Sequence, residues 1–159
     1  RMEALVMTSI FNVHRINMKK LFPLLILIST TAFAAKEDVV YTWKPIKVLD
    51  GDTVKFEAPW VPKPLKPEIS IRVMGVDTPE KGFRAKCADE DKRGQMATAF
   101  TKQAVSQAQK KQIILMDWDK YGGRVLGDVL LNGQSLRMML IQNGYAREYY
   151  GEAKTSWCN

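Results

Sequence analysis

Histidine is almost absent from this sequence, since the only one among the 159 residues is His14. From residue 15 onward, this excludes Ser-His-Asp and Cys-His catalysis, histidine zinc sites and histidine-based nucleases. Any acid–base chemistry there must rely on Asp, Glu, Tyr, Lys or metal-bound water.

Cysteine and long apolar runs are also scarce. The two cysteines, Cys87 and Cys158, are too few for a thiolate zinc site. The longest apolar run, Leu21 to Ile28, is shorter than the roughly twenty residues that a membrane-spanning helix needs.

The first 34 residues are typical of a secretory leader rather than of a folded domain. A charged start at Met18-Lys19-Lys20 precedes the apolar run, and Ala32-Phe33-Ala34 is a small-x-small cleavage site. We expect residues 18–34 to be the signal peptide and residues 1–17 an upstream extension, with an uncleaved anchor or a buried helix as the alternative. Cleavage would leave residues 35–159 as one domain, exported to the periplasm or the medium, monomeric and without stable membrane association.

The net charge of the exported part suits an anionic partner. The leader carries four basic residues and one acidic residue, so the formal charge falls from +7 to +4 when it is removed. This modest basic excess is compatible with nucleic acid but does not require it.

Export also places the two cysteines in an oxidising compartment, which predicts a Cys87–Cys158 disulfide. The alternative is two unpaired thiols. A bridge between residues 71 positions apart would stabilise the fold by roughly 4 kcal/mol in the chain-entropy account.

The pattern of apolar residues predicts five strands and about two helices. The strands are expected at 39–49, 53–57, 69–76, 112–118 and 125–131, and the helices at 95–110 and 135–142. A proline-rich loop is expected at 58–67 and a second loop at 81–93. This order predicts an α+β domain built on a small, partly open Greek-key barrel of the oligonucleotide/oligosaccharide-binding (OB) type.

The run Asp50-Gly51-Asp52-Thr53 allows two interpretations. Residues two apart on a strand share a face, so Asp50 and Asp52 can point into one pocket. The alternative is an ordinary Asp-Gly hairpin turn in which Asp52 is solvated.

The run Asp77-Thr78-Pro79-Glu80 is equally ambiguous on its own. Thr78 can cap a helix that begins at Pro79. Alternatively, Pro79 keeps Thr78 extended and holds Asp77, the Thr78 carbonyl and Glu80 at fixed offsets. Because the two acidic runs end adjacent predicted strands, their oxygens can converge on Ca²⁺ or Mg²⁺.

Two arginines accompany these acids. Arg72 lies five residues before Asp77, which places the two on opposite faces of a strand unless Gly75 introduces a bulge. Arg124 follows Gly122-Gly123, which can bring a backbone close to a ligand. The alternatives are an ordinary surface charge for Arg72 and a simple turn before Arg124.

These motifs together resemble the staphylococcal nuclease (thermonuclease) family. The matching elements are Asp-Gly-Asp-Thr at 50–53, Arg-x-x-x-x-Asp-Thr-Pro-Glu at 72–80 and Asp-Lys-Tyr-Gly-Gly-Arg at 119–124, in the same order. The likeness covers about residues 41–150. It implies a five-stranded OB-fold barrel and a calcium-dependent endonuclease that hydrolyses DNA and RNA to 3′-phosphates, with Mg²⁺ as the alternative metal.

The resemblance also implies roles for individual residues. Asp52, Asp77 and the Thr78 carbonyl would hold the metal, and Asp50 would support them from outside the first ring of ligands. The catalytic residues would be Arg72 and Arg124 on the phosphate and Glu80 beside the attacking water. Tyr121 and Tyr150 would contact the nucleotide.

The sequence departs from the best-known member of that family in three places. Gly123 adds a residue before Arg124, the 58–67 loop is longer, and most of the C-terminal helix is missing. We expect the disulfide to replace the anchoring of that helix. The other functions to consider are a catalytically inactive module of the same fold that binds nucleic acid or a protein, and an envelope protein that uses the 60–65 loop.

Overall fold

The computed structural model describes residues 39–158, so the expected leader lies outside the described part. A mixed sheet forms the centre of the domain, with the strand order β1-β6-β7-β4-β3-β2 and β8 paired to β7. Its strands are β1 Val40–Tyr41, β2 Pro45–Asp50, β3 Thr53–Glu57, β4 Glu68–Val73, β6 Lys111–Trp118, β7 Arg124–Leu131 and β8 Gln134–Ser135.

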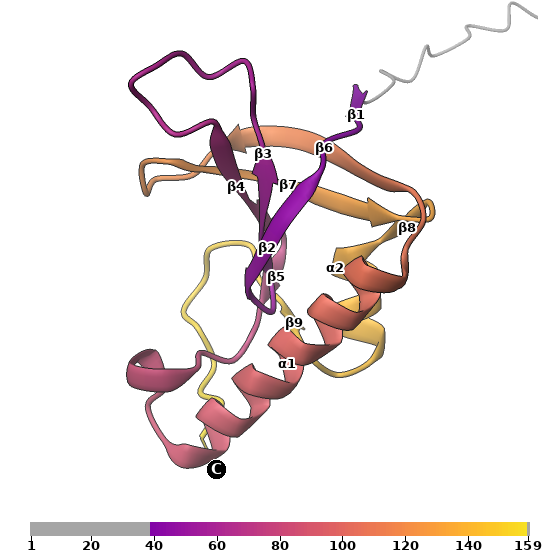
Figure 1. The fold of residues 1–159 in the computed structure, drawn as a ribbon. Helices are drawn as coiled ribbons and strands as arrows, with labels where there is room; N and C mark the ends of the chain where they lie inside the picture. Colours follow the sequence, from indigo (N-terminus) through magenta and orange to yellow (C-terminus); the bar gives the residue numbers. More distant parts are fainter. Residues whose placement is uncertain (1–38, 159) are drawn as a thin grey trace, which may run out of the picture. The chain divides into compact units, whose positions relative to one another are not determined.

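The helices are α1, Ala88–Gln107, and α2, Leu136–Gln142, with a short 3₁₀ helix at Gly82–Arg84. Figure 1 shows α1 lying alongside the sheet, next to β2 and α2. Within residues 39–158, no helix is long and apolar enough to cross a membrane.

The β4–β7 pair is parallel, whereas the neighbouring pairs in the sheet are antiparallel. A parallel pair needs a long crossover, and the chain makes it through α1 and β6. The described strands leave the sheet open, with β2 and β1 as its two ends. This open mixed sheet with two helices is consistent with the α+β, OB-type domain that the sequence predicts.

The core lies between the sheet and the two helices. Alternate residues of β4 are buried, namely Ile69, Ile71 and Val73, which is the period-two pattern of a half-buried strand. Phe56 from β3 and Leu140 from α2 are fully buried beside them. Each such side chain contributes about 1.5–3 kcal/mol when it leaves water.

Two of the predicted strands are interrupted. The 39–49 segment is divided into β1, which pairs with β6, and β2, which pairs with β3. The 69–76 segment ends at Val73 and turns at Gly75, whose φ is +79°. Beyond this turn, β5 at Val76–Asp77 pairs with β9 at Arg147–Glu148 in a separate ribbon.

The prediction of a loop over 81–93 was wrong in its second half, because α1 begins at Ala88 rather than near Gln95. The first turn carries Asp89, Glu90 and Asp91, whose negative charges favour a helix N-terminus. Cys87 caps the helix by accepting the Glu90 N–H on its sulfur. This turn lacks apolar periodicity, so its helical character was not evident from hydrophobic spacing.

The predicted Cys87–Cys158 disulfide is confirmed, with an S–S distance of 2.15 Å and a Cα–Cα distance of 6.0 Å. It joins the start of α1 to the C-terminal segment, and the two lie close together in Figure 1. The segment after β9 contains no further helix or strand up to residue 158, so the disulfide is what ties it covalently to the rest of the domain.

Replacing both cysteines with serine should lower the free energy of unfolding by roughly 4 kcal/mol, because the unfolded chain regains the entropy of a loop that spans 71 residues. Urea denaturation with and without a reducing agent measures this loss. Reductant should destabilise the wild type and leave the double variant unchanged. Equal stability of the two oxidised proteins would contradict the prediction.

Candidate metal and phosphate site

The turn between β2 and β3 is a hairpin, and it buries an acid. Asp50 and Thr53 face each other across the turn that Gly51 and Asp52 make. Asp52 is only 3% exposed, so the interpretation of Asp52 as a solvated turn residue is wrong. A Cβ at Gly51 would lie 2.8 Å from the Cβ of Ala97, so only glycine lets the turn approach α1 this closely.

The buried Asp52 carboxylate is neutralised by Arg72. The Arg72 guanidinium lies 2.8 Å from Asp52 Oδ2, and the Thr53 hydroxyl donates to Oδ1 at 2.9 Å. Burial raises the pKa of Asp52 above its ordinary value, although the charge of Arg72 and the hydrogen bond from Thr53 oppose this rise. Arg72 also donates to the carbonyl of Val76 at 3.3 Å, so the turn at Gly75 brings it to the segment that carries Asp77.

Asp77 lies at the end of β5 and is also buried. Its Oδ2 accepts a hydrogen bond of 2.9 Å from the indole N–H of Trp157, and its Oδ1 lies 2.6 Å from Lys154 Nζ. The neighbouring Thr78 packs against the turn between β2 and β3, since its Cγ2 lies 3.1 Å from a Cβ built on Gly51. No helix begins at Thr78, because the chain from Thr78 to Lys81 is irregular, so the helix-cap interpretation is wrong.

Glu80 and Asp50 are joined through Arg84. The Arg84 guanidinium lies 2.7 Å from Asp50 Oδ2 and 3.2 Å from Glu80 Oε2. The backbone of Glu80 rests on α1, where the buried Glu90 accepts its N–H at 3.4 Å and Gly94 lies against its carbonyl.

A cleft of about 270 Å³ opens beside these groups. Its walls come from the 77–86 segment and the C-terminal segment and include Asp77, Thr78, Glu80, Arg84, Lys154 and Trp157.

Arg124 begins β7, in register with Ser70 of β4. Arg72 lies two residues beyond Ser70, so the two arginines lie on the same face of the sheet. Arg124 Nε is held 2.6 Å from Asp119 Oδ2. Burial acts to raise the pKa of Asp119, but the hydrogen bonds from Arg124 and the Tyr121 N–H outweigh it and hold the pKa below the ordinary value.

The two tyrosines differ in their surroundings. The Tyr121 ring is exposed and lies 5.2 Å from the Arg124 guanidinium carbon, so the structure brings this pair together. Tyr150 is also exposed, but it lies against Gly75 and 5.8 Å from the guanidinium carbon of Arg137. Gly123 has a φ of +79°, a conformation that favours glycine, so the added residue is part of the turn that presents Arg124.

The donor atoms fit a hard divalent cation in kind. Asp52 and Asp77 are buried carboxylates, Thr78 adds a backbone carbonyl next to Asp77, and oxygen donors are those that Ca²⁺ and Mg²⁺ prefer. Asp77 Oδ1 is buried, and among the described residues it has an ion pair with Lys154 at 2.6 Å but no hydrogen bond. Within residues 39–158, however, no three carboxylate, imidazole or thiolate side chains gather into a ready-made cage.

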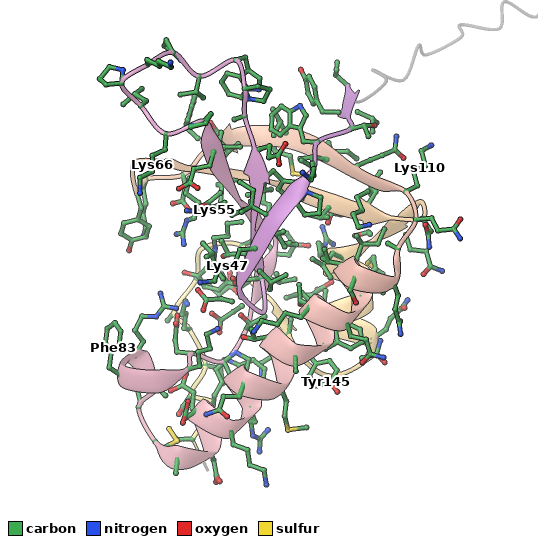
Figure 2. All side chains as sticks on the ribbon, in the orientation of Figure 1. Lys47, Lys55, Lys66, Phe83, Lys110 and Tyr145 are labelled. Atoms are coloured by element: carbon green, nitrogen blue, oxygen red, sulfur yellow. A yellow bond between two sulfur atoms is a disulfide. The ribbon has the colours of Figure 1, made fainter. Side chains whose placement is uncertain are left out.

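Several residues of the site were not predicted from the sequence. They are Arg84, Glu90, Asp119, Lys154 and Trp157, which contact the predicted residues directly or hold their backbone. Phe83 was also not predicted. It is fully exposed next to Arg84, and Figure 2 shows its ring pointing away from the body of the domain. The sequence held one sign that the C-terminal segment reaches the site. Trp157 directly precedes Cys158, and the predicted disulfide ties Cys158 to Cys87.

Comparison with models of known protein families shows the family of this chain. The model of a family described as staphylococcal nuclease homologue matches residues 70–157, more than half of the chain. The chain belongs to this family. The matched stretch includes Arg72, Asp77, Arg124 and Trp157, whereas Asp52 lies before it. In this member of the staphylococcal nuclease homologues, the contacts above therefore join matched and unmatched parts of the chain into one site.

Replacing Arg72 with methionine should cost about 3 kcal/mol of stability in EDTA, because it leaves the Asp52 carboxylate buried and unpaired. The double variant Asp52→Asn/Arg72→Met should recover most of this loss, since neither partner then carries a charge. Urea unfolding of the single and double variants measures both values. A loss below about 1 kcal/mol for Arg72→Met would show that the pair is unimportant for stability.

Replacing Gly94 with alanine should destabilise the domain by about 1–3 kcal/mol through overpacking, although alanine is the better helix former. The new Cβ would lie 2.4 Å from the carbonyl oxygen of Glu80 and would push that residue away from α1. Gly122→Ala is the matched control, because its Cβ would meet nothing within 4 Å. Thermal unfolding compares the two, and equal effects would refute the close contact of Glu80 with α1.

Proposed function

We propose that this protein is an exported, metal-dependent nuclease that hydrolyses phosphodiester bonds of DNA and RNA and leaves 3′-phosphates. The observation that supports it most is the buried Asp52–Arg72 pair, whose arginine also reaches the carbonyl of Val76 next to Asp77, in a chain of the staphylococcal nuclease homologue family. Two carboxylates and an arginine in one place match the needs of a phosphodiester reaction, in which negative charge must be shielded.

Arg72 and Arg124 would hold the phosphate. An arginine stays protonated at all ordinary pH values, so both side chains act as electrostatic clamps rather than as proton donors. Each guanidinium is already oriented by a carboxylate, Arg72 by Asp52 and Arg124 by Asp119. Such preorganised donors stabilise developing charge without having to reorient during the reaction.

Glu80 would act on the attacking water. Its carboxylate borders the cleft and is 37% exposed, so water can reach it. Glu80 can accept the proton of that water or only orient it, and both roles require the fixed backbone position against Gly94. Arg84 would hold the Glu80 and Asp50 carboxylates close to each other.

Asp52, Asp77 and the Thr78 carbonyl would hold Ca²⁺, with Mg²⁺ as the alternative, and Asp50 would support them. When bound, such a cation supplies positive charge to the phosphate and lowers the pKa of water at the site. The chain's own contribution is to keep both carboxylates buried and oriented in advance.

Exposed rings next to the site would contact the bases. Tyr121 accompanies Arg124 and Phe83 accompanies Arg84, and both are well exposed, with Tyr150 as a further candidate near Gly75. Stacking of a base on an aromatic ring contributes about 1–3 kcal/mol without sequence preference. The disulfide supports folding in an oxidising compartment, the periplasm or the medium, and we propose that the protein acts there as a monomer.

One observation favours a second function, a catalytically inactive module that binds nucleic acid or a protein. Asp52 and Asp77 already face side-chain cations, Arg72 and Lys154. If these ion pairs are permanent, then no divalent cation can bind, and the arginines remain only as a binding surface.

Digestion of plasmid DNA and of RNA with Ca²⁺, Mg²⁺ or EDTA tests the proposal. We expect cleavage with at least one metal and none in EDTA. Replacing Arg72, Glu80 or Arg124 with alanine should lower kcat by about 10²–10³-fold, the usual cost of removing a preorganised group.

Arg93→Ala is the matched control, because Arg93 is an exposed arginine on α1 and should leave the rate unchanged. Absence of cleavage under every condition, together with retained binding of single-stranded DNA, would favour the inactive module. Full activity of Glu80→Ala would leave a nuclease in place but refute the assignment of Glu80.

A further inference from the structure

Both oxygens of the Asp77 carboxylate are engaged by the C-terminal segment. Trp157 donates its indole N–H to Oδ2 at 2.9 Å, and Lys154 places its ammonium 2.6 Å from Oδ1. Asp77 and Trp157 are buried, whereas the Lys154 side chain is 43% exposed. The contact with Trp157 is therefore buried, whereas the contact with Lys154 is open to solvent.

The disulfide holds this segment over the carboxylate. Cys158 follows Trp157 and is bonded to Cys87 at the start of α1. Arg147 stacks on the Trp157 ring with its guanidinium carbon 3.8 Å from the ring centre, and it also donates to the carbonyl of Ser156 at 2.9 Å. These contacts fix the indole, so Asp77 Oδ2 has a permanent donor.

Lys154 has the features of a removable cation. It lies in an irregular stretch, and it holds Oδ1 by an ion pair without a hydrogen bond. Its Nζ also lies 5.5 Å from the centre of the Tyr149 ring, a second place where a positive charge is stabilised. Moving from Asp77 toward this ring would therefore cost Lys154 one ion pair and keep a contact that it already makes.

We propose that Lys154 is a built-in cation that competes with the divalent metal for Asp77, while Trp157 is the positioning residue that orients the carboxylate. This inference rests on the metal site of the proposed function. The ammonium occupies the oxygen that Trp157 leaves free, so a metal can bind Asp77 only after Lys154 withdraws. The affinity for metal is then set by this lysine as well as by the acidic ligands.

Removal of the competing charge should strengthen metal binding in the absence of any substrate. At ion-pair distance, one unit charge changes the binding energy of a divalent cation by enough for about a tenfold change in Kd. Lys154→Met should therefore bind Ca²⁺ about tenfold more tightly than the wild type. Lys154→Arg, which keeps the charge, should stay close to the wild type.

The experiment is a calorimetric Ca²⁺ titration of the oxidised protein, paired with NMR of the indole N–H groups. Lys86→Met is the matched control, because Lys86 lines the same cleft but its Nζ is not paired with Asp77 in the described residues. It should change Kd by less than about threefold. The Trp157 indole signal, assigned with Trp157→Phe, should shift on titration because its acceptor Asp77 binds the metal. Before titration, a chemical shift of this signal away from the unfolded value also shows that each variant is folded.

The outcomes separate this inference from the proposed function. Tighter binding by Lys154→Met but not by Lys86→Met supports the competition, even if no variant cleaves nucleic acid, in which case only the nuclease proposal fails. Unchanged affinity of Lys154→Met, an equal effect of Lys86→Met, a Trp157 signal that does not move, or absence of Ca²⁺ binding by every variant would each overturn it.

Discussion

The domain depends on providing cations and hydrogen-bond donors for the carboxylates in its interior. An isolated buried carboxylate is very costly, so each one needs a cation or several hydrogen bonds nearby. Asp52 receives its partner from β4, and Asp77 receives two from the C-terminal segment. Because these partners come from separate parts of the chain, pairing them with the acids also fixes how those parts are arranged relative to one another.

Helix α1 is the reference surface for both acidic runs. Gly51 approaches it at Ala97, and Thr101 donates its hydroxyl to the Gly51 carbonyl at 2.6 Å. Glu80 rests on it at Gly94. Gly51 in the β2–β3 turn and Gly94 on the helix therefore allow two acidic segments, distant in sequence, to pack against α1. The parallel β4–β7 pair places Arg72 and Arg124 on one face of the sheet, and these arginines complete the charged residues of the candidate site.

Local pattern predicted the parts of the fold that local forces determine. The five main strands and both helices are present, because the spacing of apolar residues is visible in short stretches. The disulfide, which was predicted from the expectation of export, is also present. The start of α1 was misplaced, since capping and charge rather than apolar spacing establish its first turn. The burial of Asp52 depends on Arg72 and the contacts of Asp77 depend on Lys154 and Trp157, and such long-range pairings have no local signal.

The hydrogen bond between Asp77 and Trp157 joins residues 80 positions apart. Contacts of such long range form late in folding, because the entropy of closing a long loop must be overcome before the contact adds stability. Asp77 therefore remains without its indole donor until the C-terminal segment has docked. The surroundings of this carboxylate are consequently complete only once a distant part of the chain has docked.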